Sequence, residues 1–155
     1  MSILTAFITH EGGRVHEVAG YISLACAGLR ISLGFWGPKE AKFSRFVKSP
    51  GATLAYAKDV LQKRESHFLN HNPLGAVMVL ALLILSLVGA SFGALYVTDR
   101  FWGIEWVISL HTWLTWPILG LVAIHLLGVL HASWRHRENL IAAMLHGKKP
   151  SDPKL

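Results

Sequence analysis

The chain has 155 residues, of which 52% are apolar and 15% charged, and its formal net charge is +6. Soluble domains carry about 25% charged residues, so this composition, with uncharged apolar runs longer than about 18 residues, excludes an ordinary soluble enzyme and a disordered chain. The lone cysteine, Cys26, excludes an intramolecular disulfide and a cysteine-based metal site. Because the chain has nine histidines and one cysteine, imidazole is the side chain to consider for any metal or cofactor site.

Three apolar spans predict transmembrane helices, at about residues 15–36, 73–97 and 106–134. Each is long enough for a hydrocarbon core of about 30 Å at 1.5 Å per residue. Residues 1–9 are apolar but too short to span, and they lack the basic start of a signal peptide. We therefore expect an all-α integral membrane protein, with one domain over residues 1–149 and a polar tail at 150–155.

A fourth helix is expected between the first two spans, at about residues 50–63. Ser49 followed by Pro50 is typical of a helix start. Apolar residues follow at helical spacing, at Leu54, Ala57 and Leu61. The pattern predicts a short amphipathic helix at the cytoplasmic interface, and a fully solvated helix is the alternative.

The charges predict the topology, because Lys and Arg collect on the cytoplasmic side of membrane proteins. The loop between the first two spans and the C-terminal tail hold most of the basic residues, whereas the opposite side holds only Arg14 and Arg100. We therefore expect this loop and the C-terminus in the cytoplasm and the N-terminus outside. The basic residues on the cytoplasmic side are Lys39, Lys42, Arg45, Lys48, Lys58, Lys63, Arg64, Arg135, Arg137, Lys148, Lys149 and Lys154.

Three histidines in or beside the spans are the candidate ligands. His111 and His125 lie fourteen residues apart, which on a straight helix gives about 21 Å of rise and a facing difference of about 40°. His16 begins a span that runs in the same direction, so it lies at a depth similar to that of His111. Imidazole is an axial haem ligand, so the spacing predicts haem between His16 and His111. Hydrogen-bonded packing residues are the alternative, and a kink at Pro117 would change the phase.

Arg30 and two glycines lie near these depths, and each has two possible roles. Arg30 lies near the depth of His125, where it pairs with haem propionates or extends to the cytoplasmic interface. Gly89 and Gly93 form a small-xxx-small pattern that allows close helix packing and also leaves room for a flat macrocycle.

Several short stretches, taken in their order and spacing, resemble the bacterial cytochrome b561 / Ni,Fe-hydrogenase b-type cytochrome family over about residues 10–149. With His111 and His125, the stretches are His16-Glu-Val-Ala-Gly-Tyr21, Leu29-Arg-Ile-Ser-Leu-Gly-Phe-Trp-Gly37, Phe43-Ser-Arg-Phe-Val-Lys-Ser-Pro50, His71-Asn-Pro-Leu-Gly75, His136-Arg-Glu-Asn-Leu140 and Ala143-Met-Leu-His-Gly-Lys148.

The resemblance implies a four-helix membrane bundle that holds two b-type haems. It implies that His16 is the ligand from the second helix, that His111 and His125 are those from the fourth, and that Arg30 occupies a position where the family has arginine. The family's first helix has no counterpart, and residues 1–8 resemble its end, so either the start codon lies upstream or this is a shortened member. We therefore expect three spans of that bundle, one complete bis-histidine haem b site and an incomplete site at His125.

The expected function is that of a b-type cytochrome of the bacterial inner membrane. The resemblance implies electron transfer in a respiratory chain between the quinone pool, a cytochrome c or a hydrogenase-type oxidoreductase, with no nucleic-acid partner. A quinone-linked oxidase with an open haem is one alternative, which CO binding would reveal. A haem-free membrane anchor is another, which the absence of a Soret band would reveal.

Overall fold

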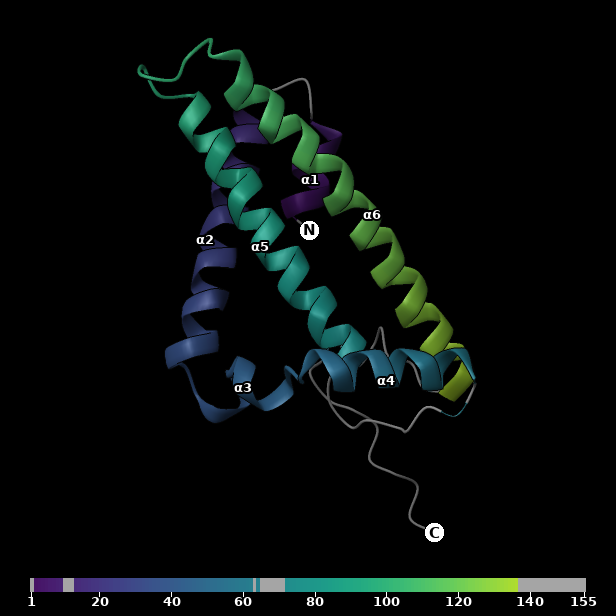
Figure 1. Cartoon of the computed structure of the whole chain (residues 1–155). Coiled ribbons are helices and arrows are strands. Elements are labelled where there is room, and N and C mark those ends of the chain that lie inside the picture. The colour runs from purple at the N-terminus through teal and green to yellow at the C-terminus, as the bar shows by residue number, and fades with distance from the viewer. Residues whose placement is uncertain (1, 10–12, 63, 65–71, 137–155) are drawn as a thin grey trace. The chain divides into compact units, whose positions relative to one another are not determined.

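The computed structural model describes residues 2–9, 13–62, 64 and 72–136, and this part of the chain is entirely helical apart from turns (Figure 1). Three helices, α2, α5 and α6, are long and apolar enough to cross a membrane. The predicted fold class, an all-α membrane protein with three spanning helices, is confirmed; the expected tail at residues 150–155 lies outside the described residues. In chain order the helices are α1 (Ser2–Ile8), α2 (Arg14–Trp36), η1 (Lys39–Ala41), α3 (Phe43–Phe46), α4 (Pro50–Leu61), α5 (Pro73–Tyr96) and α6 (Glu105–His136).

The chain divides into two compact units, residues 1–118 and 119–155, and α6 continues from one into the other. The division falls between residues 118 and 119, next to Pro117, which lies inside α6. Because proline has no N–H, the carbonyl one turn earlier, that of Trp113, has no helical donor at this point. The first unit contains helices α1 to α5 and the start of α6, and the second contains the rest of α6 with His125.

Helix α2 packs through a stripe of small residues. Its buried residues, Ala19, Ser23, Ala27 and Gly34, recur close to the helical period, and this face meets α1 and α5. The Ser23 hydroxyl donates to the carbonyl of Ala19 at 2.8 Å and lies 2.9 Å from the Ser2 hydroxyl of α1. Only 17% of the most apolar stretch of α2 is buried, so the rest of this helix presents a surface suited to lipid.

Helix α5 begins at a well-formed N-cap. The Asn72 side chain accepts from the Gly75 N–H at 2.7 Å, and Pro73 occupies the first turn, where a missing N–H costs nothing. Helix α5 runs back past α2 and ends in a turn where Tyr96 stacks on Trp102 with ring centroids 5.6 Å apart. The C-terminal end of α5 therefore lies on the same side of the first unit as the N-terminal ends of α2 and α6.

The chain between α2 and α4 folds back onto α2. Arg30 donates to the carbonyl of Ala41 at 3.1 Å, and its guanidinium carbon lies 5.1 Å and 5.8 Å from the ring centroids of Phe43 and Phe46. The Phe43 ring also lies against Gly34, at the place that a larger residue's Cβ would fill. These contacts fix η1 and α3 against the second half of α2.

Helix α4 crosses the start of α5 at a large angle (Figure 1) and packs against α5. The predicted helix start is confirmed, because the Ser49 hydroxyl accepts from the Ala52 N–H at 3.3 Å and Pro50 is the first helical residue. Leu54 and Leu61 are 74% and 85% exposed. An apolar ridge therefore runs along the outward side of α4.

Candidate functional site

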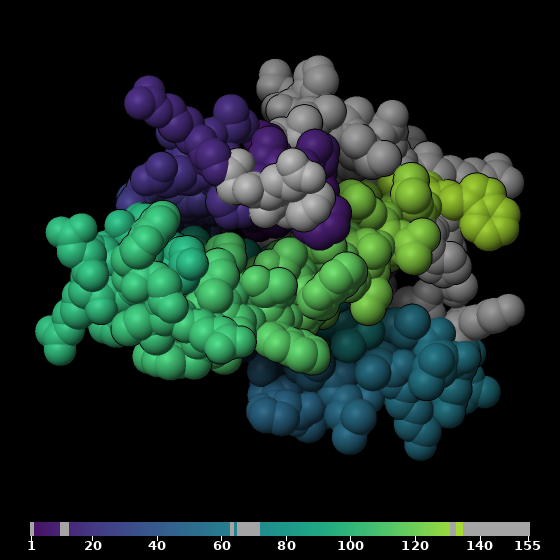
Figure 2. Space-filling model, turned by 90° about the horizontal axis from the view of Figure 1, so that it is seen from above, coloured from purple at the N-terminus to yellow at the C-terminus, as the bar shows by residue number. Residues whose placement is uncertain are grey.

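The first unit brings two of the predicted histidines together. His16 lies in the first turn of α2 and His111 in the second turn of α6, and both side chains are half-buried. Their ring centroids are 5.8 Å apart and the ring planes are 84° to one another. Figure 2, which looks onto this end, shows the N-terminal residues (purple) adjoining those around the α5–α6 turn (green).

Both rings are oriented by main-chain carbonyls. Nδ1 of His16 lies 2.8 Å from the carbonyl oxygen of Ala6, and Nδ1 of His111 lies 2.8 Å from that of Gly89. A carbonyl only accepts, so Nδ1 carries the proton in each ring. In the neutral imidazole, Nε2 is then an unprotonated lone-pair donor. This is the arrangement by which metal-binding histidines are usually held.

The Gly89–Gly93 pair makes the carbonyl of Gly89 accessible. In an α-helix the carbonyl of one residue points toward the N–H four residues later, so a side chain at position 93 would stand beside the Gly89 oxygen. A Cβ on Gly93 would lie 2.9 Å from Cε1 and 3.0 Å from Nδ1 of His111. Glycine at 93 therefore leaves the space that the His111 ring occupies. Gly89 differs, since a Cβ there would meet Leu114 and Ile118 of α6 at the ordinary contact distances of 3.6–3.7 Å.

The carbonyl of Ala6 is available for a different reason. Ala6 lies in the last turn of α1, where carbonyls lack the helical N–H partners of the interior. The Thr9 hydroxyl lies 3.4 Å from the same carbonyl. Helix α1 packs along α2, so the end of α1 meets the first turn of α2. His16 is therefore held by a carbonyl at the end of α1. His111 is held by a carbonyl in the middle of α5, which is accessible because residue 93 is glycine.

A buried hydroxyl marks the same face of α5. Ser86 is 7% exposed, and its Oγ has no hydrogen-bond partner in the described part of the chain. Ser86 precedes Gly89 by three residues and Gly93 by seven, so all three share one side of the helix. The unpaired Ser86 hydroxyl lies about one turn along α5 from Gly89, and a buried hydroxyl of this kind is expected to meet a polar partner.

These residues fit a metal that brings most of its own ligands. The described residues contain no group of three or more His, Cys, Asp and Glu side chains suited to a metal ion, whereas a structural zinc site takes four protein ligands. Haem iron needs only one or two axial ligands from the protein. Two imidazoles bound in line, each at about 2 Å from the metal, have ring centroids about 6 Å apart, close to the 5.8 Å observed. The histidine pair therefore fits haem.

The other predicted site residues lie elsewhere. Arg30 is fourteen residues beyond His16 and contacts Ala41, Phe43 and Phe46, while His125 belongs to the second unit. Sequence reasoning missed the carbonyls of Ala6 and Gly89, since every residue carries a carbonyl. It also missed Ser86. The Gly89–Gly93 pattern is the one sequence signal that pointed at the His111 side of the site.

Comparison with known proteins gives one family match. A family model described as "Prokaryotic cytochrome b561" matches residues 2–147, which is most of the chain. No curated protein and no solved structure gives a significant match. The matched range includes both histidines of the pair, the fold-back held by Arg30, and His125.

Proposed function

Because the chain belongs to the prokaryotic cytochrome b561 family and so is a membrane-bound, haem b-containing electron-transfer cytochrome, we propose that His16 and His111 are the two axial ligands of its haem. The observation that carries this proposal is the paired geometry. The rings come from two spanning helices, lie 5.8 Å apart, and each has Nδ1 on a main-chain carbonyl. Nε2 of each ring is thereby the free coordinating nitrogen.

In this proposal the chain's own residues hold and tune the cofactor and do no substrate chemistry. Bound haem supplies a one-electron redox centre. His16 and His111 would both hold its iron, which would leave no open position and would favour electron transfer over oxygen chemistry. The carbonyls of Ala6 and Gly89 fix the two ring orientations. Gly93 keeps the space beside the His111 ring open.

We further propose that His125 belongs to a second, incomplete haem site. It lies fourteen residues after His111 on α6, which is about 21 Å along the helix, so the two histidines need separate haems. Arg30 is the proposed partner of a haem carboxylate. A guanidinium has five N–H groups, and the bond to Ala41 engages one of its nitrogens.

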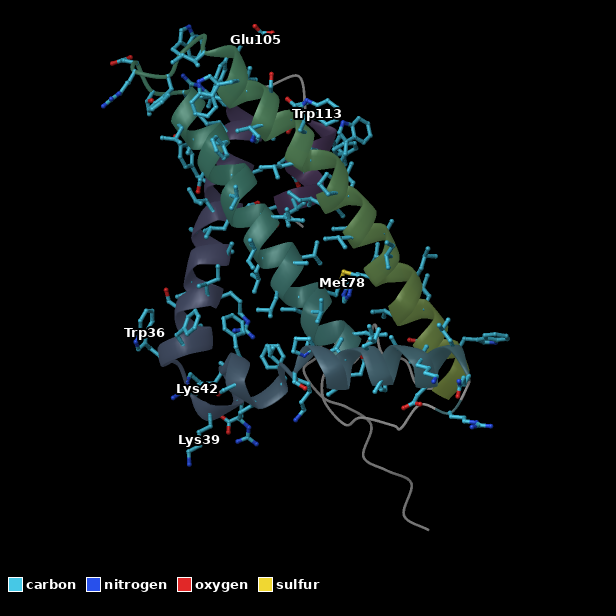
Figure 3. The ribbon with its side chains drawn as sticks, in the orientation of Figure 1. Trp36, Lys39, Lys42, Met78, Glu105 and Trp113 are labelled. Atoms are coloured by element: carbon cyan, nitrogen blue, oxygen red, sulfur yellow. The ribbon has the colours of Figure 1, made fainter. Side chains whose placement is uncertain are left out.

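The proposed orientation places the Trp36 end of α2 in the cytoplasm. Lys39 and Lys42 project from the chain just beyond Trp36, whereas Glu105 lies at the opposite end (Figure 3). Basic residues at one end of the spans favour the cytoplasmic side. In a bacterial inner membrane the His16–His111 site then faces the periplasmic leaflet, and the electron partners are the quinone pool, a cytochrome c or a hydrogenase-type oxidoreductase.

The test is the haem content of the purified chain in detergent, with a reduced-minus-oxidised spectrum. We expect one b-type haem per chain, and we expect His16→Ala and His111→Ala each to remove it. His125→Ala is the matched control, because it deletes an imidazole from the same helix as His111 and should leave this haem in place. Normal spectra in both ligand variants would show that the assignment is wrong. A well-folded wild-type chain without haem would refute the proposal.

A further inference from the structure

Residues 39–61, which comprise η1, α3 and α4, form a strongly basic surface at one end of the spans. This basic segment holds five Lys or Arg residues against the two acids Glu40 and Asp59. Four of the basic residues recur every third position, and all but Lys42, which is half-buried, are exposed. The five are Lys39, Lys42, Arg45, Lys48 and Lys58.

The basic segment is a fixed surface, because its two halves are anchored to spanning helices. Arg30 of α2 holds η1 through the Ala41 carbonyl and holds α3 through the rings of Phe43 and Phe46. Phe35 of α2 adds an edge-to-face contact with Phe43 at 5.5 Å between centroids. Helix α4 packs on α5. The charges are thus presented in a constant place next to the end of α2 and the start of α5.

Apolar side chains on this segment and at the adjoining end of α2 are strongly exposed. Leu54 and Leu61, seven residues apart, lie on one side of α4 and are 74% and 85% exposed. Trp36, where α2 ends, is 82% exposed, and Figure 3 shows it pointing sideways above Lys42. Viewed along the spans, α3 and α4 (blue) extend to one side, as expected of a helix lying in the membrane plane (Figure 2).

We infer that the basic segment is a binding surface for anionic phospholipid headgroups. A helix with an apolar ridge and a basic rim lies in the boundary between headgroups and acyl chains. Clustered Lys and Arg beside a spanning helix attract anionic lipids, by about 1 kcal/mol each, which corresponds to about fivefold in affinity. The exposed tryptophan is the type of side chain that lies at headgroup level. Leu54 and Leu61 then contact acyl chains, and the lysines contact lipid phosphates.

The experiment measures which lipids stay with the chain. The full-length protein is reconstituted in nanodiscs with equal amounts of phosphatidylglycerol and phosphatidylcholine, and its retained lipids are quantified by native mass spectrometry. We expect phosphatidylglycerol to be enriched on the wild type. Lys39→Gln with Lys42→Gln should reduce the enrichment, by up to about fivefold for each charge removed.

The control removes the same charge from the other end of the spans. Arg14→Gln with Arg100→Gln should keep the wild-type enrichment, and circular dichroism should show unchanged helix content in both variants. The inference fails if the wild type shows no preference, if the Lys39/Lys42 variant keeps it, or if the control loses it equally. Displacement of the lipid by inorganic phosphate would show a site for free phosphate and would also overturn it. None of these readouts involves haem, so the result is independent of the ligand proposal.

Discussion

Gly93→Ala tests whether the glycine on α5 sets the position of the His111 ring. The new Cβ would lie 2.9 Å from Cε1 and 3.0 Å from Nδ1 of the ring, whereas ordinary contacts begin at 3.4 Å. The ring must therefore retreat by about 0.5 Å. A retreat of that size lengthens the 2.8 Å bond from Nδ1 to the Gly89 carbonyl beyond the usual range.

The expected effect is a weaker haem site in a chain that still folds. Loss of an outer-shell bond to a metal-ligating histidine typically costs about 10–100-fold in metal affinity. We expect Gly93→Ala to weaken haem binding by about tenfold, measured by titrating the haem-free protein with haem and following the Soret absorbance. Far-UV circular dichroism should remain unchanged, because alanine is the better helix former.

Gly20→Ala is the matched control. Gly20 lies in α2, one turn from His16, and a Cβ there meets nothing within 4 Å. The substitution adds the same methyl group to a spanning helix near the site, so haem affinity should not change. If Gly93→Ala binds haem as tightly as the wild type, or if both variants weaken binding equally, the reasoning about the Gly93 space is refuted.

Two further results are expected from the same geometry. Because both axial positions are filled by imidazole in the proposed site, the reduced protein should show no spectral change with CO, and a shifted Soret band would indicate an open haem instead. Arg30→Ala should loosen η1 and α3, since it removes a charged hydrogen bond to Ala41 and the stacking on Phe43 and Phe46. These contacts are together worth about 2 kcal/mol. Faster proteolysis within residues 39–49 would reveal the loosening, Arg30→Lys should lessen it in part, and equal cleavage of wild type and Arg30→Ala would contradict the anchoring role.

The spanning helices could be read from the sequence because membranes impose a simple rule. A helix must supply about 20 apolar residues to cross the hydrocarbon core, and the uncharged run of α5 does so without ambiguity. The parallel direction of α2 and α6 follows from the number of spans between them. That direction alone places His16 and His111 at one depth, and the structure brings their rings into contact.

The rest of the site could not be predicted because it depends on main-chain atoms and on a fold-back. No side-chain pattern announces that Ala6 will offer its carbonyl, since this depends on where α1 ends and how it packs on α2. The contacts of Arg30 could not be predicted from the sequence either. The sequence placed it by depth alone, and its bond to Ala41 exists because η1 and α3 turn back toward α2.

The use of carbonyls as acceptors has a consequence for how the site tolerates sequence change. A carboxylate acceptor would bring a negative charge into the membrane interior, where charge is expensive. A carbonyl supplies the same orientation without that charge, and no substitution of Ala6 or Gly89 deletes the acceptor itself. What a substitution can change is access to it. The vulnerable positions are therefore the ones that shape the backbone surface. On the His111 side this is Gly93, and on the His16 side these are the residues that end α1 within reach of α2.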